Sequence, residues 1–95
     1  MDIVVTVPKK EYKKDDDEIK KMKETDLATY EITPLPDISI GNRVFFIREG
    51  KVHSSMRIKE IRKNFNANIL ILNDYKDENI DISIKGFPGY RYKWW

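Results

Sequence analysis

The stretch "ISIGNRVFFIREGKVHSSMRIKEIR", residues 38–62, decides the fold. Its first apolar run, "RVFFI" at 43–47, has the composition of a strand, and a second run, "VHSSMRIKEI" at 52–61, follows directly after "REGK". Tight turns between antiparallel strands need positive φ angles, which glycine adopts at little cost. Gly50 in the intervening segment therefore predicts a β-hairpin.

Side chains of the second strand should alternate between the two faces of the sheet. Met56 and Ile58 then share one face, whereas Ile61 is out of step with them. One extra residue in a strand, a β-bulge, shifts the alternation in this way. We therefore expect a bulge near Glu60.

Residues before the hairpin predict two strands that flank one helix. The β-branched segment 2–7, "DIVVTV", favours a strand that Pro8 ends. Residues 9–25 are highly charged and carry only a thin apolar stripe at helical spacing, which is typical of a largely solvated helix. The segment 26–32, "DLATYEI", favours the next strand, and a proline-rich loop follows it.

Residues after the hairpin predict more strands. The run at 65–74 has a continuously apolar centre, which is typical of a strand covered on both faces. The polar segment 75–79 predicts a loop, and 80–85 alternates like a further strand.

The ending "GFPGYRYKWW", residues 86–95, predicts a turn and a last strand. In that strand Tyr90, Tyr92 and Trp94 would share one face, which we expect in the core. The other face would carry Arg91, Lys93 and Trp95.

These elements predict a single domain over residues 1–95 that is α+β and mostly β. About five to seven short strands, with one helix after the first, would favour a mixed β-barrel that hides its edges.

The composition excludes several classes of site. The chain has 95 residues, no cysteine and one histidine, so disulfides, thiol catalysis and a zinc site held by cysteine or histidine are not expected. No apolar run approaches the roughly 20 residues that span a bilayer, and the first residues do not resemble a secretion signal. We expect a cytoplasmic protein, monomeric or weakly dimeric, with no cofactor, metal or membrane partner.

The net charge of +2 is unevenly distributed along the chain. Residues 41–64 and 85–95 are strongly basic, whereas 24–40 and 65–84 are acidic. If the fold brings the two basic segments together, they form a face that attracts phosphate.

The central stretch resembles a known family. The positions that match are Gly41, Asn42, Arg43, Val44, Phe45, Phe46, Gly50 and Glu60. With the order strand, helix, strand, proline-rich loop and hairpin, they are similar to the small β-barrels of the PUA-like superfamily, particularly its ASCH branch. The ending is also similar to the closing segment of small phage and bacterial proteins of this type.

The resemblance implies a pseudobarrel with a cleft between the first helix and the sheet that binds RNA or receives a modified base. We therefore expect a non-catalytic module that binds RNA or DNA, or a modified base or nucleoside, in an aromatic-lined cleft with a basic rim. The candidate rim is Arg43, Arg48, Lys51, Arg57, Lys59, Arg91 and Lys93. Alternation puts Phe45 and Phe46 on opposite faces of one strand, so at most one of the pair should line a cleft. The candidate walls are Tyr30, Phe45 and Trp95, with Phe46, Phe87, Tyr90, Tyr92 and Trp94 as further aromatics.

Two alternatives stay open. Some small ASCH proteins are amidohydrolases that act on acylated cytidine, and the residues to test for that activity would be Lys23, Thr25 and Glu60. The glycine and arginine of that family's motif are missing around Lys23. A small, charged, cysteine-free domain could instead inhibit or adapt a host protein, with an edge strand or the terminal tryptophans as its anchor.

Overall fold

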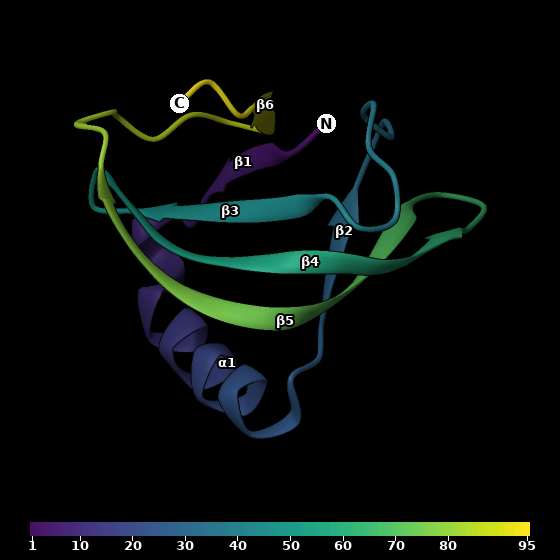
Figure 1. Ribbon diagram of the computed structural model, residues 1–95, viewed down its shortest axis with the longest axis horizontal. Coiled ribbons are helices and arrows are strands. Elements are labelled where there is room, and N and C mark those ends of the chain that lie inside the picture. Colours follow the sequence, from purple (N-terminus) through teal and green to yellow (C-terminus); the bar gives the residue numbers. More distant parts are fainter.

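Six strands form one sheet in the order β2-β5-β4-β3-β1-β6 in the computed structural model, which describes residues 1–95 (Figure 1). The chain is α+β and mostly β, as predicted. Its elements are β1 (Ile3–Thr6), the short 3₁₀ helix η1 (Lys9–Glu11), α1 (Tyr12–Thr25), β2 (Ala28–Ile32), β3 (Arg43–Arg48), β4 (Lys51–Lys63), β5 (Asn68–Asp81) and β6 (Tyr90–Tyr92). No helix is both long and apolar enough to cross a membrane.

The predicted hairpin is confirmed as β3 and β4. Its connection consists of Glu49 and Gly50, which both have positive φ angles, 55° and 76°. Two consecutive residues of that kind form the turn whose twist matches antiparallel strands. The backbone N–H of Glu49 also donates to the hydroxyl of Tyr12, 3.1 Å away, so the start of α1 is fixed to this turn.

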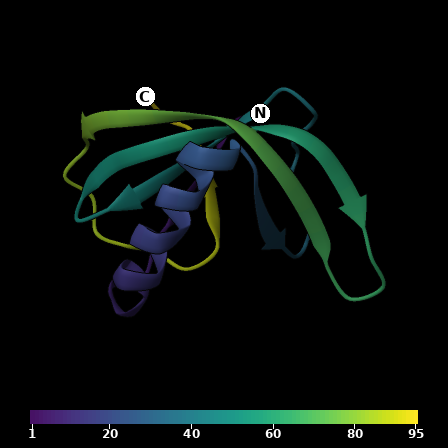
Figure 2. The same ribbon diagram turned by 90° about the horizontal axis from the view of Figure 1, so that it is seen from below.

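The sheet is strongly curled into a half-barrel, and Figure 2 shows it arching over α1. The register between β4 and β5 shifts at three places, one of them between Ile58 and Glu60, which confirms the predicted bulge. Asp74 in β5 also has a left-handed backbone conformation, with a φ of 53°. Bulges and left-handed residues bend a strand locally, so they account for the curl.

The half-barrel is not closed by hydrogen bonds between strands, because β2 and β6 remain its edges. The loop at 33–42 spans this opening. Leu35 and Ile38 in the loop pack against the core, and the N–H of Asp37 donates to the hydroxyl of Tyr92 in β6. A loop, not a further strand pair, therefore bridges the two edges.

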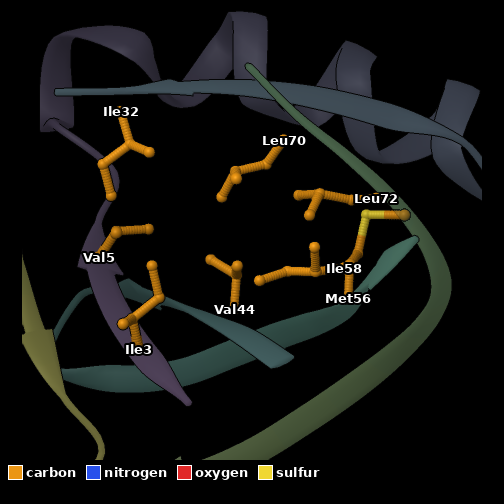
Figure 3. Close-up of a cluster of buried hydrophobic side chains, with 8 residues drawn as sticks. All are labelled: Ile3, Val5, Ile32, Val44, Met56, Ile58, Leu70 and Leu72. Atoms are coloured by element: carbon orange, nitrogen blue, oxygen red, sulfur yellow. The ribbon is translucent and has the colours of Figure 1, made fainter. Parts of the chain in front are cut away.

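The inner face of the sheet carries the larger core, and the side chains of this core point toward one another in Figure 3. Its eight buried residues are Ile3, Val5, Ile32, Val44, Met56, Ile58, Leu70 and Leu72. Tyr90 and Tyr92 of β6 pack against this cluster, as expected for one face of the last strand.

The outer face, opposite to the inner one, carries a smaller core. Val4, Phe45, Ile47 and Val52 are buried there. The end of β5, with Ile80, and the segment that follows it, with Ile82, Ile84 and Phe87, cover them. A side chain at Gly86 would lie 3.0 Å from the Thr6 methyl group, so glycine permits this segment to approach β1 closely.

Three sequence predictions about these segments are wrong. Residues 75–79 are not a loop, because β5 continues to Asp81 and its polar residues pair with polar residues of β4. Residues 82–85 therefore form no separate strand. The apolar centre of β5 is fully buried on one face only, at Leu70 and Leu72, while Ile71 is half-buried.

Candidate nucleic-acid interface

An aromatic platform lies on the outer face, beyond the end of β6. The indole of Trp95 packs edge-on against Phe45, with ring centroids 5.3 Å apart, and Trp94 packs against Trp95 at 5.2 Å. Trp94 and Trp95 remain 47% and 37% exposed. We call these two tryptophans the tryptophan platform, since each is held by an aromatic neighbour and still presents surface to solvent.

The position of Trp94 differs from the sequence prediction, which placed it in the core with Tyr90 and Tyr92. Strand β6 ends at Tyr92, so strict alternation ends there too. Trp94 then lies against Phe87 of the outer face, with ring centroids 6.5 Å apart.

Two cations stand beside the tryptophan platform. The ammonium of Lys93 lies 5.1 Å from the ring centre of Phe45 and 5.5 Å from that of Trp95. The guanidinium of Arg91 lies 4.4 Å from the ring centre of Phe87. Both side chains are exposed, and neither forms an ion pair with a carboxylate. Their charges therefore remain available to an anion.

The outer face continues with basic residues of the hairpin. Arg43 of β3 is directly opposite Arg57 of β4. Arg57 forms an ion pair with Asp74 at 3.0 Å but stays half exposed. Lys59 is exposed and has no carboxylate partner. The fold thus brings parts of both basic segments of the sequence onto one face.

The guanidinium of Arg43 uses most of its donors in hydrogen bonds within the protein. Its side chain is only 15% exposed. It donates to the Asp74 carboxylate at 2.8 Å, to the Asp74 carbonyl at 2.7 Å and to the Ser55 hydroxyl at 3.1 Å. The hydrogen bond from Arg43 holds the pKa of Asp74 below its ordinary value. We conclude that Arg43 organises the outer face but has few donors left for a ligand.

Arg48 and Lys51 lie at the far end of the hairpin, beside the turn. Arg48 stacks on the ring of Tyr12 at 4.2 Å and pairs with Asp15 and Asp16 of α1. Lys51 is exposed at the start of β4. Arg48 therefore fixes the helix to the sheet, and of these two residues only Lys51 is free.

Tyr30 lies on the inner face, away from Phe45 and Trp95. It lines a cavity of about 360 Å³ between α1 and the sheet, together with Phe46, whose ring centroid is 6.3 Å away at a steep interplanar angle. Val5, Ile19, Met22 and Leu72 contribute aliphatic surface. Phe45 and Phe46 point to opposite faces, as the alternation predicted, and only Phe46 reaches this cavity.

The helix side of this cavity is acidic. Glu11, Asp15 and Glu18 line it together with a single cation, Lys14. Burial raises the pKa of Asp15 even though Arg48 opposes that shift, and burial also raises the pKa of Tyr30. The predicted aromatic cleft and the predicted basic rim are thus not brought together, because the cavity and most of the basic residues lie on opposite faces of the sheet.

The residues considered for hydrolysis do not meet. Lys23 pairs with Asp77 at 3.4 Å, the hydroxyl of Thr25 donates to the carbonyl of Lys21, and Glu60 pairs with Arg62. None of the three lines the cavity. The structure therefore assembles no catalytic arrangement from them.

Sequence reasoning missed two features. Asp15 lies at helical spacing with Tyr12, Ile19 and Met22, and all four are half-buried on the side of α1 that faces the sheet. The sequence spacing could have predicted that Asp15 shares this side of the helix. Phe65, in the turn between β4 and β5, is 97% exposed. The sequence prediction placed Phe65 in a strand over residues 65–74, which is wrong at its start, because β5 begins at Asn68.

No known protein family, curated protein or solved structure matches this chain.

Proposed function

We propose that this protein binds single-stranded nucleic acid, RNA or DNA, on the outer face of its sheet. The observation that carries this proposal is the tryptophan platform, exposed beside the unpaired cations Lys93 and Arg91. Proteins that bind single strands combine aromatic side chains, on which bases stack, with cations that follow the phosphates. The outer face offers both within one patch.

The free energies expected from base stacking and phosphate contacts are large enough to give a measurable affinity. Stacking of one base on an aromatic side chain contributes roughly 1 to 3 kcal/mol. Trp94 and Trp95 could accept one base each, and Arg57, Lys59, Arg91 and Lys93 could neutralise phosphates. Such binding depends on salt, because each neutralised phosphate releases counterions.

The resemblance to PUA-like domains of the ASCH branch is consistent with this proposal. A helix after the first strand, a curled and mostly antiparallel sheet, and the hairpin with Gly50 agree with that pattern. We propose membership of that superfamily on these grounds, and a cytoplasmic location with it.

The test uses the protein's own fluorescence, since its only two tryptophans form the platform. Single-stranded oligonucleotides should quench the emission at low salt. The logarithm of the affinity should fall with the logarithm of the salt concentration, with a slope of about −0.7 for each phosphate neutralised.

Variants localise the site. Lys93→Ala and Arg91→Ala should each weaken binding and reduce the salt slope by about 0.7. Lys20→Ala removes the same charge from an exposed position on α1 and should change neither. Absence of binding at low salt, or binding that salt does not weaken, would contradict the proposal; salt-tolerant capture of a protein would favour the adaptor hypothesis.

A second candidate function concerns the cavity between α1 and the sheet. Its volume of about 360 Å³ and the rings of Tyr30 and Phe46 suit one nucleobase, as the resemblance implies. The acidic helix side disfavours a phosphate there. A free or modified nucleoside should therefore raise the melting temperature more than its 5′-monophosphate does, and equal shifts, or none, would contradict this function.

A further inference from the structure

The turn between β4 and β5 presents an aromatic side chain far from any core. Phe65 is 97% exposed, more than any other large apolar residue of the chain. Figure 2 shows the hairpin of β4 and β5 projecting away from α1. Leaving an apolar side chain in water forgoes the free energy that burial would give, and the packing of the fold does not use this ring.

The backbone around Phe65 is held in place. The N–H of Asn64 donates to the carbonyl of Ala67 at 2.9 Å, which closes the turn, and the N–H of Phe65 donates to the side-chain oxygen of Asn64 at 2.7 Å. A ring on an ordered turn loses less conformational freedom when it is immobilised by a partner. The turn therefore presents Phe65 in a form suited to insertion.

Cations follow β4 toward this turn. Arg57, Lys59 and Arg62 are exposed along the outer face of the strand, since the bulge between Ile58 and Glu60 shifts the alternation. Lys59 has no carboxylate partner, whereas Arg57 pairs with Asp74 and Arg62 with Glu60. From Arg57 to Arg62 the strand spans about 17 Å at roughly 3.3 Å per residue. Because Arg57 faces Arg43 on the outer face, this row begins beside the tryptophan platform and ends at the turn.

We propose that Phe65 is a second base-stacking anchor, and that a single strand of nucleic acid runs from the tryptophan platform along the cations of β4 to this ring. The inference rests on the proposed function and deepens it, because it specifies a path and a minimum length. An aromatic ring stacks on any base, and exposed basic side chains along β4 contact the phosphates. A short oligomer reaches the platform alone, whereas a long one reaches both anchors.

The test compares two labelled oligothymidylates, of about 4 and about 16 nucleotides, the limits of common single-strand site sizes. Fluorescence anisotropy of the label gives the affinity. Phe65→Ala should weaken binding of the long oligomer about tenfold or more and leave that of the short one unchanged. Phe65→Trp should restore the affinity, since it keeps a stacking surface, and Asn66→Ala in the same turn is the matched control.

The results of this experiment distinguish failure of the second anchor from failure of the proposed function. If the wild-type protein binds both oligomers and Phe65→Ala does not weaken the long one, the second anchor is disproved while the platform stands. If neither oligomer binds, both proposals fail. A Phe65→Ala protein with unchanged affinity but reduced self-association in sedimentation would assign the ring to a protein contact, and would also overturn the inference.

Discussion

The indole of Trp95 covers the ring of Phe45, with their centroids 5.3 Å apart, so Trp95 shields a member of the outer core. Phe45 is buried although it lies on the face of the sheet opposite α1. The final residues are therefore a structural cover as well as a candidate binding surface.

Replacement of the covering indole should destabilise the fold. Trp95→Ala removes an aromatic pair, worth about 0.5 to 1.5 kcal/mol beyond the area it buries, and exposes Phe45. We expect a loss of about 1 to 3 kcal/mol in the free energy of unfolding, measured by urea denaturation. Trp95→Phe keeps an aromatic contact and should lose less; equal losses in the two variants would contradict this role.

Removal of residues 90–95 should abolish cooperative folding. The deletion takes away β6, which pairs with β1, and the rings of Tyr90 and Tyr92 that pack on the inner core. We expect loss of the near-ultraviolet circular dichroism signal and of a sharp thermal transition. Deletion of residues 94–95 alone, the control, should leave a cooperative but weaker transition, and a sharp transition in the longer deletion would refute the prediction.

Arg43→Ala should destabilise the protein at neutral pH by about 1 to 3 kcal/mol, because it removes several hydrogen bonds from a mostly covered guanidinium. Lys59→Ala, an exposed neighbour, should change stability by less than about 0.5 kcal/mol. Urea denaturation of both variants at pH 7 provides the comparison. A similar, small effect of both would show that Arg43 is not structural.

The loss of stability caused by Arg43→Ala should also depend on pH. Arg43 holds the pKa of Asp74 below its ordinary value of 3.8, so the folded state binds this proton less readily than the unfolded state does. The resulting stability is present above about pH 4 and is lost as pH falls through the lowered pKa. The difference between wild type and Arg43→Ala should therefore narrow below pH 4, and a constant difference would argue against the ion pair.

Asp15 and Asp16 should respond oppositely to the same substitution, although both pair with Arg48. The side chain of Asp15 is 16% exposed and burial raises its pKa, whereas Asp16 is 62% exposed and its hydrogen bond with Arg48 lowers its pKa. An ionised Asp15 thus costs stability at neutral pH, and an ionised Asp16 adds to it.

Asp15→Asn should accordingly raise the free energy of unfolding at pH 7, and Asp16→Asn should lower it. The wild-type contribution of Asp15 should become more favourable as pH falls through its raised pKa toward the unfolded value of 3.8. Urea denaturation at pH 7 and pH 4 measures both effects. Changes of the same sign in the two variants would contradict this assignment.

Local chemistry made part of the fold predictable. The turn at Gly50 and the bulge near Glu60 follow from turn preferences and from a break in alternation, which neighbouring residues encode. The continuation of β5 through residues 75–79 was not predictable in this way. Its polar residues pair with Ser54 and Ser55 of β4, and that pairing depends on partners distant in the sequence.

The sequence predicted the face on which single side chains of the candidate site lie, but not which of these side chains the fold brings together. Alternation placed Phe45 and Phe46 on opposite faces, yet it could not tell which face α1 would cover. The helix covers the face of Phe46, so the cavity acquired the acidic residues of α1, while Phe45 and the basic residues of the hairpin remained on the other face. The exposed turn of Phe65 follows from the length of the β4–β5 hairpin, which periodicity alone does not fix.

The position of β1 between β3 and β6 has a consequence for biosynthesis. This strand pairs with β3 on one side and with β6 on the other, so its partners lie at residues 44–47 and 90–92. A ribosome adds about 5 to 20 residues per second, which leaves Ile3, Val4 and Val5 without their full set of neighbours for about 4 to 17 s. During that interval the nascent chain carries an unpaired apolar strand, and transient shielding by a chaperone would protect it from aggregation.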